Sequence, residues 1–531
     1  MMIPHRPYIE TLGILAGYMM LMLASACSPH GDTFVPEPEN PDSGAGWLSL
    51  SLHMPASMSR AESHPDEPAV NHESDVENLT VFIYASGIYG LNDANTTPFH
   101  ATRYITKSEF TSDQTIGNER VITIKFQPDN YNLKLGDRIA VVANMGDLSA
   151  FTTLGQLQRY RPGATWKAGA RIADYTDFTM ASASNEYPDG YVVSPQGTGE
   201  PGSEANPLIS TISIERTAAR IDLDHKGGVW AEDNGEHFLV YPAIDKTGKT
   251  VGHVYLSHML PFNVMRQPSY ALKRISATAT PDMSCFDSWT YTGTLPKDGQ
   301  KPTAYVIEPQ TGDKASPSET DCIAWYGDTR AGLIADMGKE YFADKPRLDI
   351  NPAAEYTILS YANENTAHVN HTTADNLTGT IIRAQYVPAL LHTNVHLTAP
   401  ETAVARGTDL WRYTPQNAST DETDVIYFNT EEVAEAYRAA HPGDMASITK
   451  FDRGECYYHL WLKHTAVTDD VTATQSTFPM EYGIVRNHIY RVALTFRGIG
   501  RQGTEVDNPH NIEMTIFVRP WRFFTHDTII M

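Results

Sequence analysis

The residue with the clearest chemistry is Cys27, near the start of the chain. A hydrophobic stretch at residues 12–26 is too short to span a bilayer comfortably and ends in the small residues Ser25 and Ala26. A cysteine directly after such a signal is typical of a bacterial lipoprotein, in which the thiol receives a diacylglycerol and the freed amine a further acyl chain. We predict cleavage between Ala26 and Cys27 and lipidation of Cys27. The alternative is an ordinary cleaved secretory signal followed by a chance cysteine.

Two other groups of residues have the types and spacing of metal ligands. Cys456 and His459 have C-x-x-H spacing, but in a strand these two side chains fall on opposite faces. His368 and His371 lie three residues apart in polar sequence with no helix to align them, so a pair of loop residues is the simpler interpretation. We predict no metal site at either place and no cofactor.

Recognisable catalytic motifs are missing from the sequence. It contains no nucleophile elbow, no phosphate-binding glycine loop, no HExxH pair and no calcium loop. The paired carboxylates of glycosidases cannot be recognised in a single sequence, so a secreted hydrolase is kept as the last alternative. We predict that the protein is not an enzyme.

Charge and cysteine usage exclude further classes. The 531 residues carry a formal net charge of −24, which argues against binding to the phosphates of nucleic acid. The acidity is spread along the chain and suits the solubility of an exported protein. Three cysteines follow Cys27, at the wide spacings of Cys285, Cys322 and Cys456, so at most one internal disulfide is possible and its pairing stays open.

The next segments predict a tether and a strand. Residues 27–46 are acidic and proline-rich, which favours an extended tether that lifts the folded part off a membrane. Then four apolar residues alternate with polar ones, which is the period of a strand with one buried face: Leu48, Leu50, Leu52 and Met54. From Pro55 to Glu77 the sequence is polar and contains proline, so we expect Arg60 to lie in an exposed loop.

The remaining elements are mostly strands with few helices between them, which predicts antiparallel β-sheet and an all-β fold. We expect strands at 79–84, 121–126, 138–144, 212–216, 219–223, 457–463, 484–496 and 512–531, and helices at 154–159 and 430–440. A Pro- and Gly-rich stretch at residues 195–202 suggests a division into an N-terminal domain, residues 61–212, and a C-terminal domain, residues 213–531.

The chain end is unusually apolar. Ile512, Met514, Ile516 and Val518 alternate with mostly polar neighbours until Arg519 and Pro520, and beyond that proline Trp521, Phe523 and Thr525 take one face. Chain termini are commonly polar and frayed. A strand of this composition needs a groove in which to be buried, in its own chain or in a neighbour.

Taken in order, these segments resemble the fimbrillin family of Bacteroidales type V pili, and most closely the shaft subunits of the minor fimbrium. The resemblance is carried by the lipoprotein signal and by these segments: residues 47–55 leading to Ser59-Arg60-Ala61, residues 78–84, 140–146, 215–220, 482–490 and 518–521. The Val-Arg-Asn-His-Ile-Tyr segment at 485–490 and the late Pro520-Trp521 are the most specific, whereas residues 225–450 match weakly.

This resemblance implies two transthyretin-like β-sandwich domains and a structural, adhesive subunit carried to the outer membrane as a lipoprotein precursor. It implies that an arginine-specific protease cuts the Arg60-Ala61 bond and removes residues 47–60. A strand of another subunit, here residues 520–531 with Trp521, Phe523 and Thr525, would then fill the groove. The implied partners are other fimbrial subunits, the outer membrane and the protease, and the implied location is the cell-surface fimbrium.

Two further readings stay open. An anchor or accessory subunit of the same family would keep its lipid and its first strand. A surface lipoprotein that binds glycans would share the signal and tether, although the scarcity of helical patterns disfavours the helical-repeat kind.

Overall fold

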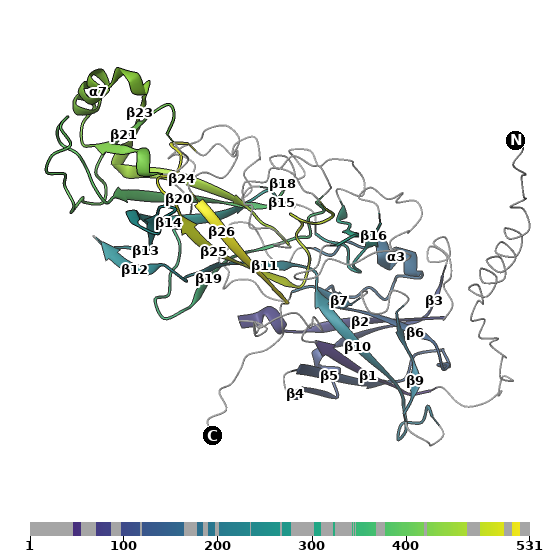
Figure 1. The fold of residues 1–531 in the computed structure, drawn as a ribbon. Helices are drawn as coiled ribbons and strands as arrows, with labels where there is room; N and C mark the ends of the chain where they lie inside the picture. The colour runs from purple at the N-terminus through teal and green to yellow at the C-terminus, as the bar shows by residue number, and fades with distance from the viewer. Residues whose placement is uncertain are drawn as a thin grey trace, which may run out of the picture. The chain divides into compact units, whose positions relative to one another are not determined.

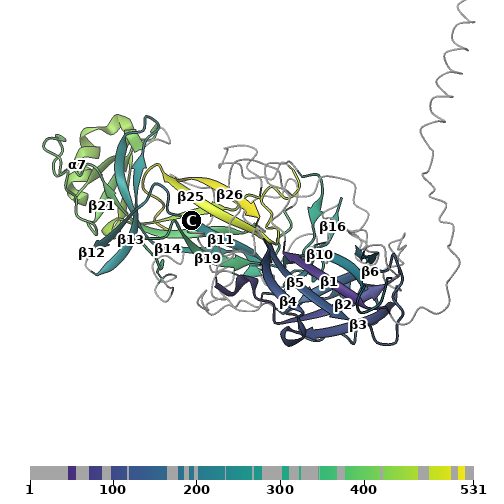
Figure 2. The ribbon, with the colours of Figure 1, turned by 90° about the horizontal axis from the view of Figure 1, so that it is seen from below.

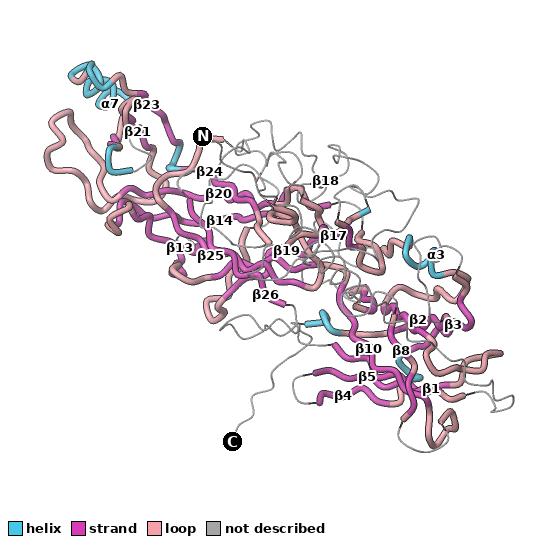
Figure 3. Tube along the Cα trace, turned by 45° about the vertical axis from the view of Figure 1, so that its right-hand side comes forward, coloured by secondary structure: helices cyan, strands magenta, loops and turns pink. Residues whose placement is uncertain are grey.

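Strands dominate the computed structural model (Figure 3). The structure describes residues 46–54, 71–85, 97–116, 119–163, 178–183, 190–196, 201–233, 235–265, 268–277, 302–309, 322–323, 342, 345, 347–367, 377–418, 422–464, 478–503 and 512–520. The predicted signal and tether with Cys27, the segment with Arg60 and Ala61, and the residues after Pro520 lie outside this part. None of the helices in these ranges has the length and hydropathy of a membrane span.

The first half of the chain builds a ten-stranded sheet (Figure 1). Its main path runs β3-β2-β6-β7-β10-β1-β5-β4, with β8 paired to β6 and β9 to β10. The strands are β1 (Leu48–Met54), β2 (Asn78–Tyr84), β3 (Phe99–Thr106), β4 (Ser112–Ile116), β5 (Glu119–Phe126), β6 (Arg138–Ala143), β7 (Met180–Ser182), β8 (Tyr191–Val192), β9 (Ser194–Pro195) and β10 (Leu208–Arg216).

The second half builds a nine-stranded sheet in the order β19-β11-β25-β13-β14-β20-β24, with β12 paired to β13 and β26 to β25. Only the Ala243–Phe496 pair connects β13 to β25. The strands are β11 (Ala219–Asp224), β12 (Val229–Asp233), β13 (Glu236–Ile244), β14 (Thr250–Phe262), β19 (Tyr356–Ala362), β20 (Gly379–Pro388), β24 (Glu455–Trp461), β25 (His488–Phe496) and β26 (Ile512–Pro520). Two strand pairs accompany it, β15 (Val264–Met265) with β18 (Cys322–Ile323) and β16 (Ile275–Ser276) with β17 (Tyr305–Val306).

An insert between β20 and β24 forms a small sheet with its own helix, and these elements group together in Figure 1. Strands β21 (Leu410–Thr414), β22 (Ile426–Phe428) and β23 (Ser447–Phe451) pack against α7 (Glu431–Ala440) around Tyr413, Phe428 and Tyr437. The hydroxyl oxygen of Thr430 accepts a hydrogen bond from the N–H of Val433 and caps α7. The insert thus has a hydrophobic core of its own.

The all-β prediction is confirmed, as are the two predicted helices, because α3 (Leu154–Arg159) begins after the capping residue Thr153 and α7 after Thr430. One predicted strand was wrong at its start: β25 begins at His488 rather than at Ile484. Asn487 has a φ of 58°, the left-handed region, and this ends extended backbone before His488. Ile484 instead makes an isolated bridge with Asn365.

The chain passes from the first sheet to the second at residues 217–218, between β10 and β11. The predicted limit between residues 212 and 213 falls within β10, which continues to Arg216. All described residues belong to one unit, residues 45–531, and the division into two domains stays a prediction.

Candidate functional site

Strand β1 lies inside the first sheet and is paired along both edges (Figure 2). On one edge it runs parallel to β10, from the Leu48–Leu208 pair to the His53–Ser213 pair. On the other edge it runs antiparallel to β5, from the Leu48–Phe126 pair to the Met54–Arg120 pair. A strand with two neighbours cannot leave without exposing the unpaired backbone groups of both.

The side chains of β1 alternate in burial, as the sequence predicts. Leu48, Leu50, Leu52 and Met54 are each 0% exposed, and the three residues between them are half-buried. The four apolar side chains belong to the main hydrophobic cluster together with Ile122, Ile124, Leu208 and Ile212 of the flanking strands. The predicted strand and its buried face are confirmed, whereas the removal of this strand stays a prediction.

Arg120 on β5 contacts both ends of the chain segment that holds Arg60. Its backbone pairs with Met54, the last residue of β1. Its guanidinium donates to the carbonyl of Ser74, just beyond residues 55–70, and is held by two hydrogen bonds of 2.8 and 2.6 Å to the carboxylate of Asp113. The bond to Asp113 raises the pKa of Arg120. Arg120 therefore holds the chain on both sides of residues 55–70, at Met54 and at Ser74. Arg60 and Ala61 themselves lie outside the described ranges.

The polar segment at residues 55–77, predicted to hold Arg60 in an exposed loop, is not a loop throughout. The 3-10 helix η1 (Asn71–Ser74) begins there, and Glu73 and Val76 are buried. The polar composition of the segment hid this, because a carboxylate that is buried against arginines cannot be told from a solvated one in a single sequence. The sequence likewise gives no sign that Arg120 binds Asp113 and Ser74 rather than water.

At the other end of the chain, β26 pairs with β25 over nine residues, from the Phe496–Ile512 pair to the His488–Pro520 pair. Ile512 and Ile516 are buried, and Met514 and Val518 pack partly buried against the main cluster. Among the strands that the structure describes, β25 is the one partner of β26. The predicted donor residues Trp521, Phe523 and Thr525 lie outside the described part.

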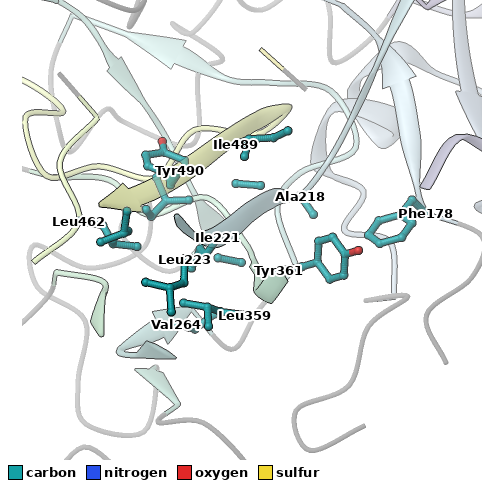
Figure 4. Close-up of a cluster of buried hydrophobic side chains, with 14 of the residues drawn as sticks. Phe178, Ala218, Ile221, Leu223, Val264, Leu359, Tyr361, Leu462, Ile489 and Tyr490 are labelled. Atoms are coloured by element: carbon teal, nitrogen blue, oxygen red, sulfur yellow. The ribbon is translucent and has the colours of Figure 1, made fainter. Parts of the chain in front are cut away.

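Two of the segments that carry the resemblance meet between the two sheets. Residues 215–220 span the passage from β10 to β11, and residues 485–490 lead into β25. The N–H of Asn487 donates to the carbonyl of Ala218 at 2.8 Å, and Figure 4 shows Ala218 near Ile489. Nothing in their spacing along the chain could have predicted this contact.

Of the four residues considered as metal ligands, the structure describes Cys456 and His459, which are both buried in β24. Cys456 is a free, buried cysteine in β24, and burial raises the pKa of its thiol to about 12. Within the described ranges no three His, Cys, Asp or Glu side chains come together as a metal-binding group. His368, His371 and Cys285 lie outside these ranges. A buried thiol with a raised pKa is a poor nucleophile and a poor ligand.

The last strands of the chain, β24, β25 and β26, are also where a known family is matched. Residues 449–527 match the fimbrillin family model. Its description is major fimbrial subunit protein type IV, fimbrillin, C-terminal, and the matched residues include the whole β25–β26 pair.

Several solved structures align with most of the chain at low identity. A fimbrilin from Porphyromonas gingivalis is 14% identical, with 90% of this chain and 99% of that chain covered and a TM-score of 0.40. A putative cell adhesion protein from Parabacteroides distasonis is 12% identical, with 91% and 99% covered and a TM-score of 0.35. The tip fimbrial protein of Porphyromonas gingivalis, solved with a C-terminal truncation, is 10% identical, with 90% and 100% covered and a TM-score of 0.34. No curated protein matches this chain.

Proposed function

We propose that this chain is a structural subunit of a cell-surface fimbria, of the minor-fimbrium shaft kind, that polymerises by exchange of a β-strand. The match of residues 449–527 to fimbrillin supports the family. The observation that carries the mechanism is β1, an interior strand of a sheet with one fully buried apolar face, followed in the chain by the segment that contains Arg60.

The proposed maturation is cleavage of the Arg60-Ala61 bond by an arginine-specific protease. Once this bond is cut, β1 is held only by pairing and packing, because no covalent link joins it to the rest of the domain. Its departure would open a groove between β5 and β10. The floor of this groove would be apolar, and β5 and β10 would each carry unpaired N–H and C=O groups along it. While β1 stays in place, the same groove is closed, which keeps the precursor from assembling.

A replacement strand would regain most of what β1 provides. Burying four large apolar side chains at roughly 1.5–3 kcal/mol each stabilises the complex by about 6–12 kcal/mol before the cost of association. The C-terminal strand of another subunit, residues 520–531 with Trp521, Phe523 and Thr525, is the proposed donor. A groove at one site and a donor at another form a heterologous contact that does not close on itself, so the product is a filament.

The signal-like stretch at residues 12–26 and Cys27 suggest how the precursor is exported. We propose that lipidation of Cys27 carries the precursor to the outer membrane and that cleavage after Arg60 releases it from this anchor. Its partners are further copies of the chain and accessory fimbrial subunits, and it needs no cofactor. Adhesion is the proposed role of the finished fimbria.

The test compares the full chain with its Arg60→Ala variant after treatment with an arginine-specific protease. The proposal expects a mass that lacks all residues up to Arg60 and a ladder of heat-sensitive oligomers on an unboiled gel, both absent from the variant. Deletion of residues 521–531 should leave the cleavage intact and abolish the ladder. Intact monomer in every sample would overturn the proposal in favour of an anchor subunit or a glycan-binding lipoprotein.

A further inference from the structure

Glu73, in η1, is buried between the two sheets and is hydrogen-bonded to residues of the second one. Its carboxylate, 1% exposed, accepts hydrogen bonds from the guanidinium of Arg220 at 3.1 and 3.3 Å. The hydroxyl of Tyr361 donates to the same carboxylate at 2.6 Å. Arg220 lies on β11 and Tyr361 on β19, so the segment before β2 is attached to both of these strands.

The partners of Glu73 are themselves fixed. Arg220 donates through two nitrogens to the carboxylate of Asp222 at 3.0 and 2.9 Å, and Arg491 of β25 donates to Asp222 at 3.0 Å. The ring of Tyr356 lies under both guanidinium groups, 5.5 Å from that of Arg220 and 3.7 Å from that of Arg491. Arg220 is thus held in place for Glu73 by Asp222 and by the ring of Tyr356.

The first sheet contributes to the same place. Arg216, at the end of β10, is 0% exposed and donates through Nε to the backbone carbonyl of Glu73 at 2.7 Å. Phe178, next to β7, packs edge-on against Tyr361 with ring centres 4.7 Å apart. Figure 4 shows the two rings next to each other. Glu73 is therefore bound by arginines of both sheets, through its backbone carbonyl to Arg216 and through its carboxylate to Arg220.

Because Glu73 and its arginine neighbours are buried, the charge of the carboxylate matters for the stability of this contact. Burial lowers the pKa of Arg216, and the negative charge of Glu73 opposes that effect. A buried guanidinium that loses its counter-charge is strongly destabilising, because it has neither water nor a carboxylate to compensate it. Neutralising Glu73 therefore weakens its bonds to Arg220 and Tyr361 and removes the negative charge beside Arg216.

We propose that Glu73 is a latch that ties the segment after residues 55–70 to the second sheet and holds the two sheets together at this point. The latch acts in the uncut chain, so it does not depend on strand exchange. In a chain cut at Arg60, it keeps the new N-terminal segment in place from η1 onward while β1 leaves. Arg120, through the carbonyl of Ser74, supports the same segment from β5.

The test is hydrogen–deuterium exchange of residues 71–77, followed by mass spectrometry, before and after treatment with an arginine-specific protease. Glu73→Gln keeps the shape of the side chain and removes its charge, and exchange in this segment should rise about 100-fold or more. Tyr361→Phe removes one hydrogen bond to the carboxylate and keeps the ring on Phe178, so the rise should be about tenfold. Strand β14 serves as the internal reference and should exchange as in the wild type.

The matched control is Glu77→Gln, which neutralises a carboxylate in the same segment. Glu77 pairs with Lys107 at 2.5 Å, but the two side chains are 44% and 46% exposed, so its loss should change exchange less than about fivefold. If Glu73→Gln unfolds the whole chain, exchange also rises in β14, and Tyr361→Phe then decides. Wild-type exchange of residues 71–77 in the folded Glu73→Gln or Tyr361→Phe variants would overturn the latch. Failure of the protease to cut leaves this comparison valid in the intact chain and counts only against the proposed maturation.

Discussion

The backbone N–H of Arg216 donates a hydrogen bond to the side-chain oxygen of Asn487, 3.4 Å away, across 271 residues of sequence. Asn487 also donates its own N–H to Ala218. It does so with a left-handed backbone, φ 58°, which asparagine tolerates better than most residues. One residue therefore ends the extended segment before β25 and joins it to the passage between the sheets.

Two substitutions of Asn487 should separate the contribution of its side-chain hydrogen bond from that of its left-handed backbone. Asn487→Ala loses the side-chain hydrogen bond and strains the backbone, and should lower the free energy of unfolding by about 2–3 kcal/mol. Asn487→Gly loses the same hydrogen bond without the strain, so its effect should be about 1 kcal/mol smaller. Urea unfolding followed by circular dichroism measures both. A glycine variant less stable than the alanine variant would contradict this account.

The buried face of β1 should be far more sensitive to truncation than the other face. Leu50→Ala removes a fully buried side chain and should lower the free energy of unfolding by about 2–5 kcal/mol. The neighbouring Ser51→Ala lies on the half-buried face and should change it by less than about 0.5 kcal/mol. Thermal melts of the uncut chain provide the comparison. Equal effects at the two positions would mean that β1 does not lie in the sheet as described.

Gly498, just after β25, lies against Glu422 of the insert. A Cβ atom at Gly498 would overlap the Cγ atom of Glu422, whose carboxylate accepts from Arg412 at 2.8 Å and from Tyr427 at 2.6 Å. Gly498→Ala should therefore lower the free energy of unfolding by about 1–3 kcal/mol through overpacking.

The control for this substitution is Gly443→Ala. A Cβ atom at Gly443 meets nothing within 4 Å, so alanine there should be neutral to within about 0.5 kcal/mol. The two alanine variants add the same methyl group, and their melting temperatures can be compared directly. Tolerance of alanine at Gly498 would show that Glu422 moves aside without cost.

Stability should fall with acidification through His258. Burial, and then the charges of Arg383 and Arg347, lower the pKa of His258 to about 4, well below the ordinary value of a histidine. Between these two values the unfolded chain binds a proton that the folded chain does not. His258 therefore destabilises the fold progressively as the pH falls from about 6.5 to 4, by up to about 3 kcal/mol.

The measurement is the difference in free energy of unfolding between about pH 7.5 and about pH 5, for the wild type and for His258→Gln. Glutamine cannot titrate, so the variant should lose less stability over this range. Ser257, whose hydroxyl lies 2.9 Å from Nδ1 of His258, is left unchanged in the variant, so the two proteins differ only at residue 258. Identical losses in the two proteins would show that His258 is protonated in the folded state or exposed to water.

The sequence predicts those features that depend on neighbours along the chain. Alternation from Leu48 to Met54 predicts the buried face of β1, and the threonines before Leu154 and Glu431 predict where the helices begin. It cannot predict that β1 lies parallel to β10, because either neighbour would bury the same side chains. The burial of Glu73 is equally hidden, since its partners Arg220 and Tyr361 come from strands far along the chain.

The alternating burial of β1 has a consequence for the spacing of any assembled fibre. A strand that replaces β1 and slips by one residue would turn its polar side chains into the core, whereas a slip by two residues restores the pattern. In the proposed fibre, a replacement strand could therefore shift along the groove only in steps of about 6.6 Å, because each intermediate position would bury polar side chains. Subunits joined in this way would differ in their axial separation only by whole steps, so the repeat length of the fibre would be quantised.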